Sequence, residues 1–303
     1  MALLDRAIAR VLPAVPRPVV RRLSDRYIAG AELADAVDAV SSLNRAGKTA
    51  TLDVLGEEVS TAEDAQAIRA EYEQAMAAIE DEGLDANVSV KLTGLGLNVD
   101  AELCAENLRT LVRAAATNGR FVRIDMEDSS TTTATLDLYR RLRAEGHDNV
   151  GIVLQAMLRR TLDDVHELGG LQPNVRVCKG IYVEPSEIAY LGDEAIRFNF
   201  EETIAALWEA GAKVAVATHD DVLVEKALDL IREHGLGLER YEFQLLLGVR
   251  EELADELVRG GHIVRIYVPY GRKWYEYSLR RLQENPKMAG YVARDLLRRL
   301  KPR

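Results

Sequence analysis

Cysteine, basic charge and long apolar runs are all scarce in this sequence, and each shortage excludes a class of protein. The two cysteines, Cys104 and Cys178, fit neither a disulfide framework nor a metal site, which favours a reducing compartment. The formal net charge of -10 argues against a nucleic-acid partner, because such binding domains usually carry a basic patch. No run approaches the roughly twenty apolar residues that span a bilayer, and no signal-peptide pattern is found. We therefore expect a cytoplasmic protein, soluble or peripheral to a membrane.

Histidine is scarce too, and this argues against a metal enzyme. Asp125, Glu127, His219 and Asp220 carry side chains that could bind zinc. Metal-dependent barrels, however, commonly show two histidines close in sequence, and none of the five histidines here is spaced as i, i+2 or i, i+4. We expect no metal ion.

What the chain does contain is an alternation of short apolar runs with longer helix-patterned segments. We expect strands at Thr49–Leu55, Asn87–Leu92, Phe121–Met126, Val150–Leu154, Val175–Gly180, Lys213–Thr218, Glu242–Leu247 and Ile263–Val268, each followed by a helix, the last over Lys273–Gln283. Strands that are apolar throughout belong to parallel sheets covered on both faces, and this repeat is typical of a (β/α)8 TIM-type barrel. An open doubly wound sheet is disfavoured because no Gly-x-Gly-x-x-Gly turn follows the first strand.

The N-terminal segment differs from the rest in charge. Residues 1–30 hold six arginines interleaved with Leu, Ile and Val: Arg6, Arg10, Arg17, Arg21, Arg22 and Arg26. A basic amphipathic segment of this kind lies on an anionic membrane surface or packs across the barrel, and the sequence leaves both readings open. No Pro/Gly-rich linker follows, so we expect one domain overall, with a helical segment 1–46 packed on a catalytic barrel 47–303.

Polar side chains gather where the expected strands end. In parallel barrels the carboxyl ends of the strands meet at one rim, which carries the active site. The residues in question are Lys91, Asp125, Glu127, Asp128, Gln155, Arg176, Lys179, Tyr182, Thr218, His219, Asp220, Gln244, Arg265 and Tyr267. Asp128 is the better candidate for a helix N-cap and Asp125 for a pocket. Together these residues predict a cationic, hydrogen-bonding pocket.

A pair of arginines follows the last strand. Tyr277, Arg280 and Arg281 lie at helical spacings that place them on one face, and adjacent guanidinium groups suit a small carboxylate held in one orientation. The alternative is a solvated, salt-bridged face, because Arg280 and Glu284 are spaced as i and i+4. A Schiff-base aldolase that uses Lys91 or Lys179 is a further alternative for the pocket.

The ordered motifs of the chain resemble the proline dehydrogenase family, specifically its short, monofunctional bacterial members. The motifs are VKLTGLG (90–96), RIDMEDSS (123–130), VLQAMLRR (153–160), VRVCKGIYVEP (175–185), VATHDD (216–221), EFQLLLGV (242–249) and RIYVPYG with WYEYSLRRLQENP (265–286). One motif falls on each of the later strands, and the resemblance covers nearly the whole chain. It implies oxidation of L-proline to 1-pyrroline-5-carboxylate by FAD bound across the strand ends.

The resemblance also implies roles for individual residues. The catalytic and substrate-binding residues would be Lys91, Asp125, Tyr182, Tyr267, Tyr277, Arg280 and Arg281. The FAD-binding residues would be Met126, Gln155, Arg176, Val177, Lys179, Gly180, Thr218, His219, Gln244, Arg281 and Glu284. Glu57 or Glu58 is expected to pair with Arg280 when the site closes. Cys178 and Ile181 stand where family members often have valine and alanine, which puts substrate breadth in doubt.

The resemblance finally implies partners. Electrons would pass from FAD to a membrane quinone, and a separate 1-pyrroline-5-carboxylate dehydrogenase would take the product. Peripheral contact with the inner face of the cell membrane would give residues 1–30 a purpose. A flavin- or amino-acid-binding barrel without catalysis stays open as a third reading.

Overall fold

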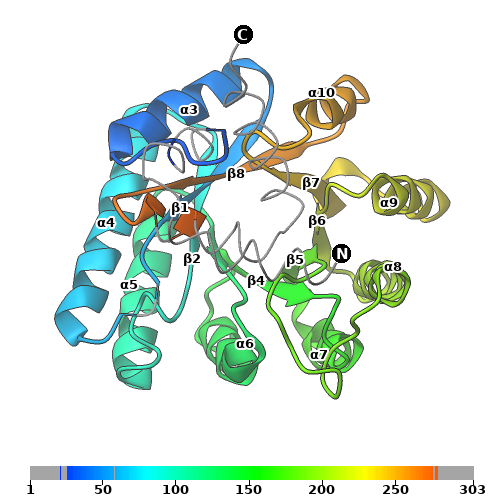
Figure 1. The fold of residues 1–303 in the computed structure, drawn as a ribbon, viewed down its shortest axis with the longest axis horizontal. Helices are drawn as coiled ribbons and strands as arrows, with labels where there is room; N and C mark the ends of the chain where they lie inside the picture. Colours follow the sequence, from blue (N-terminus) through cyan, green and yellow to red (C-terminus); the bar gives the residue numbers. More distant parts are fainter. Residues whose placement is uncertain (1–20, 22–25, 58, 276, 279–303) are drawn as a thin grey trace, which may run out of the picture.

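The computed structural model describes residues 21, 26–57, 59–275 and 277–278. Within them the chain forms a closed barrel of eight parallel strands in sequential order, with β1 hydrogen-bonded to β8. The helices form a ring around the strands (Figure 1). The expected (β/α)8 barrel is therefore confirmed, and the open doubly wound alternative is wrong.

The strands coincide with the expected ones. They are β1 (Thr49–Val54), β2 (Ala86–Val90), β3 (Val122–Ile124), β4 (Val150–Gln155), β5 (Asn174–Cys178), β6 (Lys213–Ala217), β7 (Tyr241–Leu246) and β8 (Val264–Tyr270). β3 is shorter than expected at both ends. β8 continues beyond Val268 because β1 supplies a ladder partner as far as Val54, which pairs with Tyr270.

The outer helices are α3 (Leu33–Arg45), α4 (Ala62–Asp81), α5 (Ala101–Thr117), α6 (Ser129–Ala144), α7 (Thr161–Leu168), α8 (Asp193–Glu209), α9 (Asp221–Glu233) and α10 (Glu251–Arg259). Short 3-10 turns lie at Gly169–Leu171 and Leu238–Arg240. In the described part of the chain, no helix is long and apolar enough to cross a membrane.

Helix α3 precedes the barrel yet belongs to its outer ring. It packs on β1 and β8 and touches α4, so it fills the place between α10 and α4 (Figure 1). The helix expected over 273–283 lies mostly outside the described residues, as does most of segment 1–30. A division of the chain at residue 46 stays a prediction.

Local sequence sets where several helices begin. Thr61, Asp100, Asp128 and Asp220 each accept a hydrogen bond from a backbone N–H in the first turn of the following helix. Such caps satisfy donors that have no partner inside the helix. The Asp128 carboxylate accepts from the Ser130 N–H at 2.9 Å, so the expectation that Asp128 is a cap is confirmed.

The strands separate an apolar shell from a polar interior. In β1, Leu52 and Val54 belong to the core between sheet and helices, whereas Thr51 and Asp53 alternate with them and are also fully buried. Successive strand residues point to opposite faces, so Thr51 and Asp53 point into the barrel. The barrel interior is therefore lined with hydrogen-bonding groups.

Candidate active site

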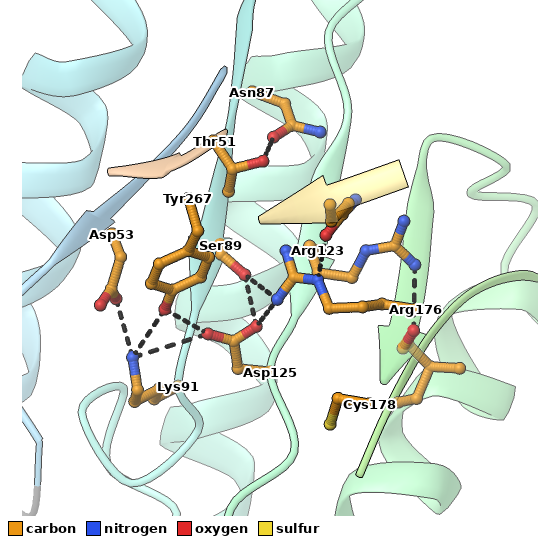
Figure 2. A network of polar contacts seen from close by, with 12 residues as sticks. Thr51, Asp53, Asn87, Ser89, Lys91, Arg123, Asp125, Arg176, Cys178 and Tyr267 are labelled. Carbon is orange, nitrogen blue, oxygen red and sulfur yellow. Dashed lines mark hydrogen bonds and ion pairs between the residues drawn. The ribbon is translucent and has the colours of Figure 1, made fainter. Parts of the chain in front are cut away.

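Lys91 is the centre of a buried cluster at the carboxyl ends of the strands. It follows directly after β2, and its Nζ lies 2.8 Å from Asp53 Oδ1, 3.3 Å from Glu57 Oε1 and 3.5 Å from Asp125 Oδ2. Nζ also donates to the Tyr267 hydroxyl at 3.2 Å, as Figure 2 shows. Burial alone would lower the pKa of Lys91, but Asp53 and the other acidic neighbours raise it well above its ordinary value. The lysine therefore stays a cation.

Asp125 joins the lysine to a second cation. Its Oδ1 accepts from Ser89 Oγ and from Arg176 Nη1, both at 2.5 Å, and its Oδ2 accepts from the Tyr267 hydroxyl at 2.7 Å (Figure 2). Burial would raise the pKa of Asp125, but Arg176 and Lys91 keep it below its ordinary value. The carboxylate is thus ionised and holds four neighbours in fixed positions.

Asp53 is a site residue that sequence reasoning missed. It is fully buried, and its Oδ2 has no hydrogen-bond partner among the described residues. Burial raises the pKa of Asp53, and Asp125 and Glu57 raise it further against the attraction of Lys91. The sequence does contain a signal for it. Thr51 and Asp53 are polar at alternate positions of an otherwise apolar strand, which indicates that both side chains point to the same face.

A second polar layer lies deeper in the barrel. Arg176 Nε donates to Gln244 Oε1 at 2.5 Å, and Gln244 Nε2 donates to Glu242 Oε1 at 2.5 Å. Arg265 Nε donates to Glu242 at 2.9 Å, and its Nη1 donates to the Ala50 carbonyl at 2.7 Å. The expectation that Arg265 lies on the rim with Tyr267 is wrong, because it pairs with Thr49 at the start of β1.

Further polar side chains surround the barrel mouth. Lys179 Nζ and Arg197 Nε both pair with Asp220, the latter at 2.7 Å. The Thr218 hydroxyl accepts from the Asp220 N–H at 3.2 Å. His219 Nε2 accepts from the Leu246 N–H at 3.0 Å. Burial and the nearby Arg250 lower the pKa of His219 to about 4, so its ring is neutral near pH 7.

Comparisons with known proteins decide the family. A family model described as "Proline dehydrogenase" matches residues 36–294. Proline dehydrogenase 1 of Bacillus subtilis subsp. natto is 36% identical over 274 residues, which cover 90% of each chain. Proline dehydrogenase of Deinococcus radiodurans is 34% identical over 300 residues, which cover 95% of this chain and 97% of that protein. The chain belongs to the proline dehydrogenase family.

A solved structure has a fold similar to that of this chain. Proline utilization A of Bdellovibrio bacteriovorus, inactivated by N-propargylglycine, matches with a TM-score of 0.82 at 21% identity. The match covers 92% of this chain and 36% of that one, so the chain spans about a third of its length. At this identity the likeness concerns the barrel alone.

The structure brings together three residues that the proline dehydrogenase resemblance assigned to catalysis and one that it assigned to FAD. Lys91, Asp125, Arg176 and Tyr267 share the contacts described above, and Gln244 joins them through Arg176. Gln155 lies at the end of β4, where its Nε2 donates to the Glu127 carbonyl at 2.8 Å. Their roles toward substrate and cofactor stay proposals.

Other expected residues pack against apolar neighbours. The side chains of Met126 and Val177 are buried in the apolar core. Tyr182 packs against the cluster of Met157, Leu158 and Ala189. Tyr277 packs with Tyr27, Ile28, Leu55 and Trp274 on the side of β1 and β8. Any contact that Met126 and Val177 make with a ligand at the mouth would therefore come from their backbone.

Gly180 follows the end of β5 with a φ of +98°, and a side chain there would meet Met157 at 2.5 Å. Only glycine adopts this backbone without strain. Arg280, Arg281 and Glu284 lie outside the described residues, and so does Glu58. The expected pairing of Glu57 with Arg280 accordingly stays a prediction. Glu57 contacts Lys91.

The electrostatics of Lys91 bear on the aldolase alternative. A Schiff-base lysine needs a lowered pKa, so that a neutral amine is available to attack a carbonyl carbon. The carboxylates around Lys91 have the opposite effect. Lys179 is paired with the Asp220 carboxylate. Neither the geometry nor the family supports this alternative.

Among the residues that the structure describes, no three His, Cys, Asp or Glu side chains are grouped as a metal ion would require.

Proposed function

We propose that the chain oxidises L-proline to 1-pyrroline-5-carboxylate, with FAD bound at the carboxyl ends of the barrel strands. The observation that carries this proposal is the buried cluster of Lys91, Asp125, Arg176 and Tyr267 in a member of the proline dehydrogenase family. It supplies two fixed cations, one ionised carboxylate and one aromatic hydroxyl at the end of the barrel where such enzymes act.

Lys91 binds the substrate carboxylate in this proposal. Its charge is secured by three acidic neighbours at 2.8 to 3.5 Å. An amino acid that brings its own carboxylate can therefore replace one of these contacts without leaving the lysine unpaired. Arg280 and Arg281, which lie outside the described residues, are proposed to bind the same carboxylate, because the guanidinium fork matches its geometry.

Tyr267 shapes the space beside the lysine. Its hydroxyl donates to Asp125 and accepts from Lys91, so its ring cannot rotate away without breaking two hydrogen bonds. We propose that this ring, with those of Tyr182 and Tyr277, bounds the apolar part of proline. Fixing the substrate in this way contributes to catalysis by orienting one C–H bond.

The side chains at the mouth suit FAD as a cofactor. Arg176, Lys179, Gln155 and Thr218 supply hydrogen-bond donors of the kind that a flavin ring and a diphosphate require. When bound, FAD supplies the acceptor for the hydride that leaves proline. Arg176 is held by Asp125 and Gln244 and contributes a fixed positive charge, and fixed charges of this kind stabilise negative charge that develops during a reaction.

A coloured protein gives the direct test. We expect purified protein to be yellow with bound flavin and to lose its visible flavin absorption when L-proline is added without oxygen. A colourless protein that borohydride traps on a substrate carbonyl would favour the aldolase reading. A yellow protein whose colour proline never changes would favour a binding protein. Either result would overturn the proposed function.

We further propose a quinone as the electron acceptor and a separate dehydrogenase as the enzyme that takes the product. The basic segment 1–30 would then bring the enzyme to the inner face of the cell membrane. Deleting residues 1–20, which leaves Tyr27 and Ile28 in place beside Tyr277, should abolish binding to anionic liposomes while leaving reduction of a soluble dye by proline in place. Unchanged liposome binding would remove the membrane part of the proposal.

A further inference from the structure

Gln244 connects two buried ion pairs that lie at different depths in the barrel. Above it, Arg176 pairs with Asp125, and below it, Arg265 pairs with Glu242. Its amide oxygen accepts from Arg176 Nε and its amide nitrogen donates to Glu242 Oε1, both at 2.5 Å. The side chain is only 5% exposed, so water does not compete for these contacts.

The two neighbours of Gln244 require the same orientation of its amide. A guanidinium N–H can only donate, and an ionised carboxylate can only accept. Turning the amide around would place two donors against each other at Arg176 and two acceptors against each other at Glu242. Each mismatch leaves a buried polar group unpaired, which is costly. Glu242 therefore holds the amide of Gln244 in the orientation that Arg176 requires.

Glu242 is itself held in place as an anion. Arg265 reaches both carboxylate oxygens, with Nε 2.9 Å from Oε1 and Nη2 3.3 Å from Oε2. Burial would raise the pKa of Glu242, but Arg265 lowers it to about 2. The lower ion pair thus gives Gln244 a rigid point of attachment.

We propose that Gln244 and Glu242 are positioning residues for Arg176. Glu242 orients the amide of Gln244, and that amide fixes the guanidinium group over the Tyr267 ring, 5.2 Å from its centroid, and against Asp125. Gln244 then acts through Arg176, although the family resemblance places it among the cofactor-binding residues. The inference rests on the proposed function, in which Arg176 supplies positive charge beside FAD.

The consequence is electrostatic and can be measured on the flavin. A guanidinium group held at one position stabilises the reduced, more negative flavin more than one that changes position. Gln244→Met keeps the length of the side chain but removes both hydrogen bonds. We expect the holoenzyme of Q244M to show a more negative midpoint potential for bound FAD. We also expect kcat for proline oxidation to fall about tenfold, with a smaller change in KM.

Glu242→Gln tests whether the lower residue acts through Gln244. A glutamine at 242 no longer dictates the amide orientation, so E242Q should shift the potential in the same direction as Q244M but less. The double variant should behave like Q244M alone, because coupled residues are not additive. Additive shifts would contradict a role for Glu242 that passes through Gln244.

Thr51→Val provides the matched control. Thr51 also points into the barrel and donates a 2.5 Å hydrogen bond, to Asn87, but it has no contact with Arg176 (Figure 2). T51V should lower the melting temperature and leave the midpoint potential and kcat unchanged.

A potential that is the same in wild type, Q244M and E242Q would overturn the inference. If Q244M does not fold, E242Q alone decides by the same criterion. A wild-type protein without flavin, or without a response to proline, would instead refute the proposed function.

Discussion

The barrel interior holds two polar clusters of similar composition that differ in what their side chains contact. The mouth cluster consists of Asp53, Lys91, Asp125, Arg176 and Tyr267, and the base cluster consists of Arg123, Asn174, Glu242 and Arg265. Residues of the base cluster are the first or second of their strands, whereas those of the mouth cluster come later in a strand or directly after it.

The base cluster is tied to the backbone. Arg123 donates to the carbonyls of Ile152 at 2.9 Å and Asn174 at 2.7 Å, and Arg265 donates to the carbonyl of Ala50. Burial, together with Arg176, lowers the pKa of Arg123 to about 9, so its charge is unfavourable where it lies. A side chain that joins strands in this way has a structural role, because moving it would break contacts between β3, β4 and β5.

The mouth cluster is tied together by side chains instead. Lys91 and Arg176 share Asp125, and all three carboxylates near Lys91 come from loops or strand ends at the mouth. A ligand with its own charge can exchange for one of these contacts without disturbing the sheet. We therefore propose that contact with backbone marks the structural ions of this barrel and contact with side chains the functional ones, because burial is common to both.

Asp125→Ala should break the mouth cluster most severely. Arg176, Lys91 and Tyr267 all lose a partner, and removing one member of a buried charge pair costs roughly 2–5 kcal/mol. We expect kcat/KM for proline to fall about a hundredfold or more, measured by steady-state reduction of a dye.

Asp128→Ala is the matched control for that experiment, because Asp128 belongs to the same motif but caps α6. It should lower stability slightly and leave kcat/KM unchanged. Less than a tenfold loss in D125A, or equal losses in both variants, would show that the mouth cluster is not the catalytic centre.

Gly151→Ala should break the base cluster. A methyl group at Gly151 would lie 2.5 Å from the Asn174 carbonyl and 2.6 Å from Arg123 Nη1. Forcing extra volume into a packed interior costs about 1–3 kcal/mol, so urea unfolding should show a loss of that size. The folded enzyme should keep its kcat.

Gly170→Ala, which meets nothing within 4 Å, is the control and should change neither quantity. A stable G151A enzyme with lowered kcat would reverse the roles given to the two clusters.

The sequence predicts most of the mouth cluster because parallel strands converge at their carboxyl ends. Lys91 and Asp125 each lie next to last in an expected strand, and the end of an apolar run can be recognised without a structure. Asp53 was missed because it lies farther inside such a run. Only its alternation with Leu52 and Val54 shows that it points into the barrel.

The depth of a residue in the barrel is harder to predict. Arg265 and Tyr267 share a face of β8 but differ by two positions, which is roughly 7 Å along a strand. That distance separates the base cluster from the mouth cluster. The partners of each side chain also depend on the stagger between neighbouring strands, which a single sequence does not reveal. The pairing of Gln244 with Arg176 therefore needed the structure.

His219, at the rim of the mouth, should make the free energy of unfolding depend on pH. Its pKa is about 4 in the folded chain against 6.5 for an unperturbed histidine. Between these two pH values the unfolded state binds a proton at this ring and the folded state does not. Stability should be full above pH 6.5 and fall as the pH drops toward 4. We expect this group alone to account for a loss of about 2 kcal/mol at pH 5.

His219→Gln tests that loss, because an amide oxygen can still accept from the Leu246 N–H without titrating. The difference in urea stability between pH 7 and pH 5 should shrink by the same amount. His234→Gln, at the exposed end of α9, should leave it unchanged. An unchanged pH dependence in H219Q would mean that other groups cause the acid instability.

Asp53→Asn should have the smallest effect and gives the finest test of the mouth cluster. The asparagine oxygen can still accept from Lys91, while Glu57 and Asp125 keep the lysine charged. Burial and the neighbouring acids raise the pKa of Asp53, so its ionised form disfavours the folded state near pH 7. D53N should therefore be as stable as wild type or more so, with kcat/KM reduced less than about fivefold. Lys91 would then depend mainly on Asp125. If D53N instead lost as much activity as D125A, Asp53 would be an equal partner in holding the lysine.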